Sequence, residues 1–152
     1  MISGKLVHLM ETHEEEITGR VAEQIRHDPD MAHTRAILRT GLGQWHRDLL
    51  ESLSHWLSTG DSETLVRRYQ HTGRERFEQG VPLHECVRDL CVLRETLLDY
   101  VEEHTFNKDS VELYAEEELD RRVGRFFDLL IVHLVRGYES ASHGVAALDW
   151  IS

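Results

Sequence analysis

Two arginines lie where the spacing of apolar residues predicts the buried side of a helix. Arg94 falls within a heptad-like run of apolar residues, and Arg76 holds a similar position in the helical segment before it. The apolar members of the run are Leu83, Val87, Leu90, Leu97 and Val101. A guanidinium on a buried face needs a partner, because burial of an unpaired charge is costly.

Two interpretations of these arginines follow from their chemistry. In the first, each arginine pairs with a nearby glutamate or lays its stem on the core with its charged end in water. The glutamates that could take part are Glu75, Glu78, Glu85 and Glu95. In the second, Arg76 and Arg94 form a fork for a carboxylate or a phosphate in a pocket between two helices. Paired or partly exposed arginines are the commoner arrangement, so the first interpretation is favoured.

Histidine is abundant in this sequence, with eleven residues. His71 lies beside an apolar helical stripe, and His133 lies inside the apolar run FFDLLIVHLV, which is predicted to be the most buried part of the chain. Haem ligation requires an imidazole on a pocket wall, and either residue could supply it. A histidine on an apolar face is more commonly a hydrogen-bonded core residue. No cofactor is therefore expected, and haem or small-ligand sensing stays as the alternative.

Motifs that carry enzyme chemistry are absent from the sequence. There is no glycine-rich phosphate loop, no G-x-S-x-G elbow and no paired Glu-x-x-His motif. The two cysteines, Cys86 and Cys91, have neither the number nor the spacing of a disulfide framework or a zinc site. His84 and Cys86 point in different directions from a helix, which disfavours a catalytic pair. We expect a protein that is not an enzyme and holds no metal.

Charge and length narrow the class of protein further. The chain has 152 residues and a net charge of −11, from 17 basic and 28 acidic residues. This excess of acid disfavours nucleic acid and anionic membranes as partners. The N-terminal apolar run is too short for a signal peptide, and no segment approaches the ~20 apolar residues of a membrane span. Without repeats or linkers, residues 1–152 are expected to form a single cytoplasmic domain.

Apolar residues recur at helical spacing from end to end, which predicts an all-α fold of five helices. Asp28-Pro29-Asp30, Gly60 and Gly80 are the expected helix ends, and Pro82 is expected to open the fourth helix. Asp109 and Glu112 are spaced as a capping box for the fifth helix. The expected helices are 3–27, 32–57, 61–80, 82–104 and 109–144, with a break at Gly144 and a last turn over 145–151.

The segment GRERFEQGVPLHECVRDLCVLRETLL resembles the hallmark segment of the N-terminal domain of RsbR-type proteins, the RsbT co-antagonists of bacterial stress signalling. The residues that carry the resemblance are Gly73, Arg74, Arg76, Gly80, Leu83, Leu93 and Arg94. The resemblance implies a globin-like five-helix bundle without haem. It also implies a sensory or docking module that forms homodimers and works with a kinase or a STAS-domain protein. No such output domain is present here, which fits either a free-standing member or a piece of a longer protein.

The expected function is therefore signal input and dimerisation without catalysis. A ligand or partner would cause a small change in helix packing, which would pass along the long fifth helix. Arg76, Arg94, His71 and His133 are the candidates for lining any internal pocket. Trp45 and Trp56 are eleven residues apart and share a helix face, which could be core or half of a helix-pair interface.

Overall fold

The computed structural model describes residues 4–104 and 110–151, with side chains for all of these except 5, 6, 110, 112 and 145–151. Every regular element in the described residues is helical, which confirms the all-α prediction. The elements are α1 (Gly4–Thr12), α2 (Glu14–His27), α3 (Ala32–Ala36), the 3₁₀ turn η1 (Leu38–Thr40), α4 (Leu42–Thr59), α5 (Glu63–Glu78), α6 (Leu83–Glu103) and α7 (Ser110–Ile151).

The first two predicted helices are each divided in the structure. His13 has non-helical angles between α1 and α2 (φ −114°, ψ 21°), and its ring lies 5.5 Å from that of Tyr100. Gly41, which separates η1 from α4, has φ 122°, a conformation that residues with a Cβ rarely adopt. The apolar spacing continues across both interruptions because the pieces pack on one core. The count of five helices was therefore too low.

The predicted ends of α4 and α5 are confirmed. Gly60 ends α4 in the left-handed conformation, with φ 69°. Gly80 follows α5 with φ 75°, and the N–H groups of Gly80 and Val81 donate to the carbonyls of Phe77 and Arg76. These two bonds form the Schellman motif, which satisfies the last carbonyls of a helix. Pro82 then precedes Leu83 at the start of α6, so α5 and α6 are joined by a tight turn.

The last helix differs from its prediction in two ways. α7 continues without interruption through Gly144 to Ile151, so no break occurs there. The run around His133 is buried on one side only, since Phe126, Phe127 and Leu130 are inaccessible to solvent while Val132 is 48% exposed. The predicted capping box at residues 109 and 112 and the side chains of the predicted last turn lie outside the described part of the chain.

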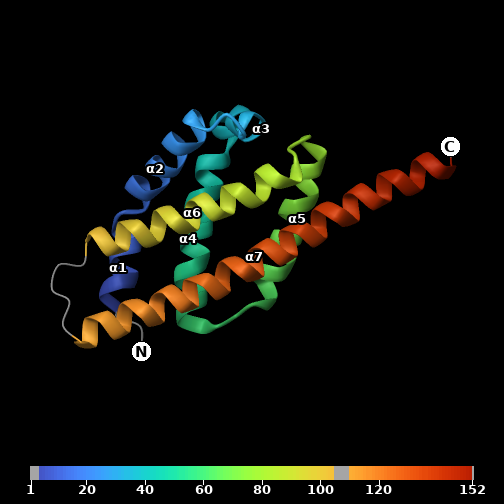
Figure 1. Cartoon of the computed structure of the whole chain (residues 1–152). Coiled ribbons are helices and arrows are strands. Elements are labelled where there is room, and N and C mark those ends of the chain that lie inside the picture. The colour runs from blue at the N-terminus through green and yellow to red at the C-terminus, as the bar shows by residue number, and fades with distance from the viewer. Residues whose placement is uncertain (1–3, 105–109, 152) are drawn as a thin grey trace.

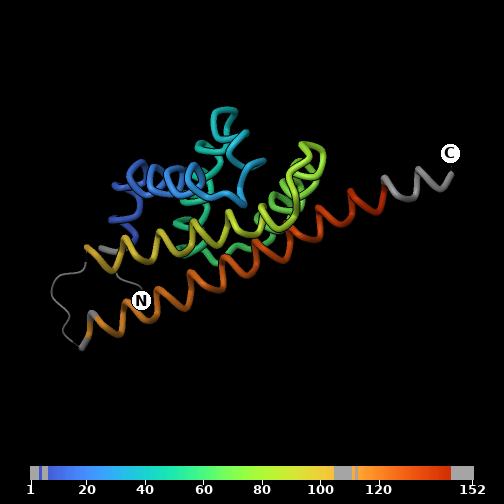
Figure 2. Tube along the Cα trace, turned by 45° about the horizontal axis from the view of Figure 1, so that its top comes forward, coloured from blue at the N-terminus to red at the C-terminus, as the bar shows by residue number. Residues whose placement is uncertain are grey.

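The long helices α6 and α7 run in opposite directions along the molecule (Figure 1). α5 packs against α7, and α2 and α3 pack against α6. α4 packs against α1, α2 and α7. At its C-terminal end α7 extends beyond the other helices, as the turned view also shows (Figure 2). In the described residues, no helix is both long enough and apolar enough to cross a bilayer.

The packing of α5 on α7 depends on two glycines. A Cβ on Gly73 would lie 2.0 Å from the carbonyl oxygen of Leu134, and a Cβ on Gly137 would lie 1.9 Å from that of Gln70. Neither distance is compatible with a side chain, so the backbones touch directly here. Phe77 and Tyr138 flank the contact, with ring centroids 5.4 Å apart. The two helices are thereby held in one register.

Replacement of Gly137 by alanine should lower the free energy of unfolding by about 3 kcal/mol, because the new methyl group forces the two backbones apart. The matched control is Gly124→Ala on the same helix, where a Cβ would meet nothing within 4 Å. This control should be more stable than the parent by about 0.5 to 1 kcal/mol, since alanine favours helix. Urea unfolding followed by circular dichroism measures both. Equal stability of the two variants would contradict the close contact.

Candidate functional site

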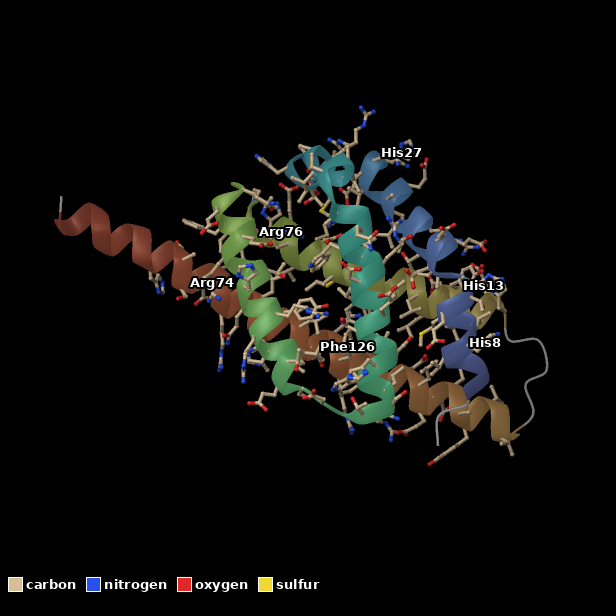
Figure 3. All side chains as sticks on the ribbon, turned by 180° about the vertical axis from the view of Figure 1, so that it is seen from behind. His8, His13, His27, Arg74, Arg76 and Phe126 are labelled. Atoms are coloured by element: carbon tan, nitrogen blue, oxygen red, sulfur yellow. The ribbon has the colours of Figure 1, made fainter. Side chains whose placement is uncertain are left out.

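Arg76 lies at the C-terminal end of α5 and is 8% exposed. Its Nη1 donates to Oε1 of Gln79 at 3.0 Å, and its guanidinium carbon lies 5.0 Å from the ring centroid of Trp45 in α4. Figure 3 shows Arg76 on the side of α5 that faces α4, with Arg74 on the other side. In the described part of the chain Arg76 forms no ion pair. The nearby glutamates considered from the sequence are therefore not its partners.

A small hollow adjoins this arginine where the start of α4 meets the end of α5. Its volume is about 180 Å³. The lining residues are Ile37, Thr40, Gly41, Leu42, Trp45, Glu75, Arg76 and Gln79. We call this the Arg76 hollow. Gly41 occupies the position before the first turn of α4 and forms no side-chain cap, so the first N–H groups of this helix lack a capping side chain there.

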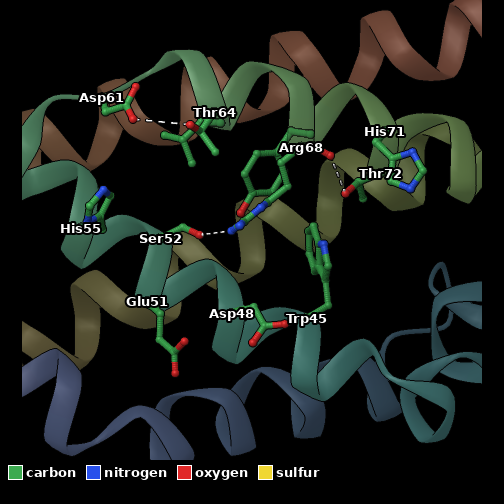
Figure 4. Close-up of a pocket in the computed structure, with 12 residues that line it drawn as sticks. Trp45, Asp48, Glu51, Ser52, His55, Asp61, Thr64, Arg68, His71 and Thr72 are labelled. Atoms are coloured by element: carbon green, nitrogen blue, oxygen red, sulfur yellow. Dashed lines mark hydrogen bonds between the residues drawn. The ribbon is translucent and has the colours of Figure 1, made fainter.

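A larger groove runs between α4 and α5 (Figure 4). Its volume is about 510 Å³, and three carboxylates line it, those of Asp48, Glu51 and Asp61. Arg68 crosses the groove and donates to the hydroxyl of Ser52 at 2.7 Å. Burial raises the pKa of Tyr69, another lining residue, to about 12, so its phenol stays protonated. The groove is open to solvent along its rim, where most of these side chains are exposed.

The four residues predicted to line a pocket are spread over the fold. His71 lines the groove between α4 and α5 and pairs with Glu75 at 2.8 Å, while Arg76 lines the hollow. His133 is half-buried on α7, and its Nδ1 lies 3.3 Å from Nε2 of Gln70. Arg94 is half-buried on α6 and lines neither the hollow nor the groove, and it makes no hydrogen bond with the described residues. Neither the hollow nor the groove therefore brings the two arginines together.

Neither histidine has the surroundings of a haem ligand. His71 is exposed and paired with Glu75, and Nδ1 of His133 lies within hydrogen-bond distance of Gln70. Burial, followed by the charge of Arg136, lowers the pKa of His133 and keeps it neutral. Haem requires an apolar pocket whose wall presents an imidazole. The geometry therefore gives no support to the haem alternative. Nor does any group of three histidine, cysteine or carboxylate side chains in the described residues form a metal-binding cluster.

Two buried carboxylates on α6 were not recognised as anchors from the sequence. Asp89 accepts a 2.8 Å hydrogen bond from Nε2 of His46 in α4, and both side chains are almost fully buried. Glu85, one turn earlier, lies 2.8 Å from Nδ1 of His33 and accepts 3.0 Å bonds from the N–H and hydroxyl of Thr34. The sequence did indicate their burial, because Glu85 and Asp89 lie four residues apart, on one face of the helix, and each precedes an apolar residue, Cys86 or Leu90. Both anchor the N-terminal helices to α6.

Cys86 lies between these two carboxylates on α6 and is 5% exposed. Burial raises the pKa of its thiol to about 12. A nucleophilic cysteine needs a lowered pKa and access to substrate. Cys86 lacks both properties and is part of the hydrophobic core.

Glu85→Gln should test the anchor through its dependence on pH. Burial opposes ionisation of Glu85, but Thr34 and His33 outweigh burial and hold its pKa below the ordinary value of 4.5. The carboxylate therefore stabilises the fold above about pH 4.5, and this contribution is lost as the pH falls through the native pKa. We expect the variant to lose about 1 to 2 kcal/mol at pH 7 and to approach the parent at acid pH.

Urea unfolding between pH 7 and pH 3.5 gives this comparison. The control is Glu78→Gln, which removes an exposed carboxylate of α5. A difference between Glu85→Gln and the parent that stays constant over the whole pH range would show that the charge of Glu85 is not what stabilises α3 on α6.

Comparison with known proteins shows which family the chain belongs to. Residues 15–149 match the family described as the RsbT co-antagonist protein rsbRD N-terminal domain, which leaves only the first fourteen and the last three residues outside the match. No curated protein and no solved structure gives a match. The family match confirms the resemblance noted in the segment around Gly80. The chain belongs to the family of RsbT co-antagonist protein rsbRD N-terminal domains.

Proposed function

We propose that this protein is a cytoplasmic signal-input domain that acts as a homodimer and passes a signal to a partner without catalysing a reaction. The partner would be a signalling protein such as a kinase or a STAS-domain protein. The observation that carries the proposal is the family match over residues 15–149, since the family is a stress-signalling N-terminal domain. The Arg76 hollow and the groove between α4 and α5 contain none of the motifs of a catalytic site. They are consistent with binding rather than catalysis.

The long helix α7 is the proposed route for the signal. Its 42 residues span about 63 Å at the helical rise of 1.5 Å per residue. It contacts α5 through Gly73 and Gly137, and its hydrophobic residues contribute to the core along α6. Because the backbones touch at the glycines, a displacement of α5 cannot be absorbed by side chains and must move α7. The C-terminal end of α7 extends beyond the other helices, where a partner could sense that movement.

A globin-like arrangement is part of the same proposal. Globins pack helices in pairs at steep angles around a core, rather than as a parallel bundle. The division of the N-terminal half into short helices is consistent with that type of packing.

The distribution of exposed apolar side chains supports dimerisation through α7. The four large apolar residues that the structure describes as exposed all lie on this helix: Val111, Leu113, Tyr114 and Val132. Tyr114 and Val132 are 70% and 48% exposed, and their spacing of five helical turns places them on one face. A two-fold symmetric dimer would cover such residues, because the same face of each copy meets its equivalent. α7 is thus the proposed dimer contact.

The double variant Tyr114→Glu/Val132→Glu should convert the dimer to a monomer without unfolding it, because both side chains are exposed and the new charges would repel across the interface. Sedimentation velocity should give twice 17.7 kDa for the parent and 17.7 kDa for the variant. His84→Glu, which places a charge on an exposed site of α6, should remain dimeric. A monomeric parent at every concentration would refute the dimer proposal.

A further inference from the structure

A cavity between α2 and the start of α4, beside α3 and η1, collects positive charge (Figure 1). Its volume is about 450 Å³. Four arginines line it, one from each of these elements, and Glu15 is its one acidic lining residue. The chain as a whole has a net charge of −11, so this concentration of positive charge is local. We call it the four-arginine cavity, after Arg26, Arg35, Arg39 and Arg47.

Three of these guanidinium groups have no carboxylate partner among the described residues. Arg35 donates to backbone carbonyls at the end of α2, at 2.8 Å to that of Asp28. Arg47 donates to the neutral side-chain amide of Gln44, with its Nη2 3.0 Å from Oε1. Arg39 forms neither a side-chain hydrogen bond nor an ion pair with the described residues. Carbonyl and amide oxygens accept hydrogen bonds, but they leave the positive charges uncompensated.

The carboxylates nearest to the cavity are engaged elsewhere. Both side-chain oxygens of Asp28 are bonded, one to the N–H of Asp30 at 2.9 Å and the other to Arg88 at 2.7 Å. Glu23 pairs with Arg26 at 3.1 Å, but both side chains are exposed, and exposed pairs contribute little. The positive charge of the cavity is therefore not neutralised from its surroundings.

The acidic residues at the start of α2 do not neutralise it either. Glu15 forms no ion pair with the described residues. Burial, followed by the charge of Glu51, raises the pKa of Glu14, and the opposite effect of Arg47 is too small to prevent this. Arg47 is thus close enough to act on Glu14 without pairing with it. Like charges held together in this way favour a counterion of the opposite sign.

Two glycines keep the cavity open. Gly19 and Gly43 both line it, and a Cβ on either would meet nothing within 4 Å. Neither glycine has a positive φ, so neither a close contact nor a turn requires its lack of a side chain. Gly19 lies inside α2, where glycine weakens a helix relative to alanine. The space that the glycines leave is available to a ligand bound among the arginines.

We propose that the four-arginine cavity binds a small ligand that carries two or more phosphate groups. Planar guanidinium groups bind phosphate oxygens in pairs, and several such groups suit a multiply charged ligand better than a single carboxylate. The volume of about 450 Å³ lies within the range of small-molecule sites. A long nucleic acid fits less well, because the acidic remainder of the chain would repel it.

The consequence for signalling rests on the function proposed above, whereas binding itself does not. A ligand held by arginines of α2, η1 and α4 would join these elements and oppose their separation. α4 in turn packs against α7, the proposed route of the signal. In this view the phosphorylated ligand is the input, and the N-terminal helices transmit its binding to α7.

The test is isothermal titration with sodium pyrophosphate at constant ionic strength and without divalent metal, and separately with inorganic phosphate and acetate. Pyrophosphate should bind saturably with Kd below about 1 mM, and inorganic phosphate about tenfold more weakly, because it reaches fewer arginines. Acetate should give no measurable binding. NMR of the labelled protein should show the pyrophosphate shifts at the amides of Gly19 and Gly43 and at the side chains of Arg39 and Arg47.

The variant Arg39→Gln/Arg47→Gln should weaken pyrophosphate binding about tenfold or more, because it removes two charged donors from the cavity. The matched control is Arg67→Gln/Arg74→Gln, which removes the same charge from two exposed sites of α5 and should leave the affinity unchanged. Circular dichroism shows whether each variant is folded. If the first variant does not fold, Arg39→Gln alone replaces it, because Arg39 has no partner to lose.

Three results would overturn the proposal. The first is the lack of saturable pyrophosphate binding, or shifts spread evenly over all basic residues. The second is a folded cavity variant that binds as tightly as the parent. The third is a single-stranded oligonucleotide that binds more tightly than pyrophosphate at the same amides, which would make the site one for nucleic acid. Sedimentation without ligand reports the dimer separately, so failure of this site and failure of the proposed function are distinguishable.

Discussion

The direct contact between the backbones of α5 and α7 at Gly73 and Gly137 is the constraint on which the remaining packing depends. Each glycine lies against a carbonyl of the other helix, at a distance that excludes even a methyl group. Helices packed this closely cannot slide without backbone collision. The contact therefore sets the register in which Phe77 meets Tyr138 and in which the hydroxyl of Tyr138 donates to the carbonyl of Val81 at the tight turn. The start of α6 is positioned by the same contact.

Two buried carboxylates on α6 hold the N-terminal helices in place. Glu85 binds the start of α3, and Asp89 binds His46 of α4. Buried carboxylates are tolerated only when their oxygens are bonded, so these contacts specify one position for the N-terminal helices rather than merely adding attraction. Nδ1 of His46 is the exception, since it is buried without a hydrogen-bond partner. This atom is a polar cost that the surrounding packing must offset.

Between the glycine contact of α5 with α7 and the carboxylate anchors on α6 lies the region where α4 meets the end of α5. α5 is held to α7 by backbone contact, but it meets α4 through longer polar and aromatic side chains such as Arg76, Trp45 and Arg68. Such side chains can adjust, and both the hollow and the groove lie along this junction. The structure thus combines a stiff contact on one side of α5 with an adaptable one on the other. That asymmetry is consistent with the signal route proposed above, in which a displacement of α5 moves α7.

The periodicity of apolar residues and the turn residues Gly60, Gly80 and Pro82 were enough to predict an all-α fold and the course of its second half, because helix ends depend on local chemistry. The residues around Gly80 were also enough to identify the family. The breaks at His13 and Gly41 were missed, since both sides of each break face the same core and the spacing continues across it. Gly144 has no packed neighbour and did not interrupt α7, so a glycine alone was a poor guide there.

For the site residues, too, the sequence predicted the local features but not the partners that lie far away along the chain. The sequence determined that Arg76 lies on a buried face, because that follows from helical spacing within α5. Which groups surround it was decided by the tertiary structure, where Trp45 and Gln79 take the place of the expected glutamates. Glu85 and Asp89 instead bond to residues 43 to 52 positions away along the chain. Partners at such distances depend on how the helices are juxtaposed in the folded chain, which no local pattern of residues shows.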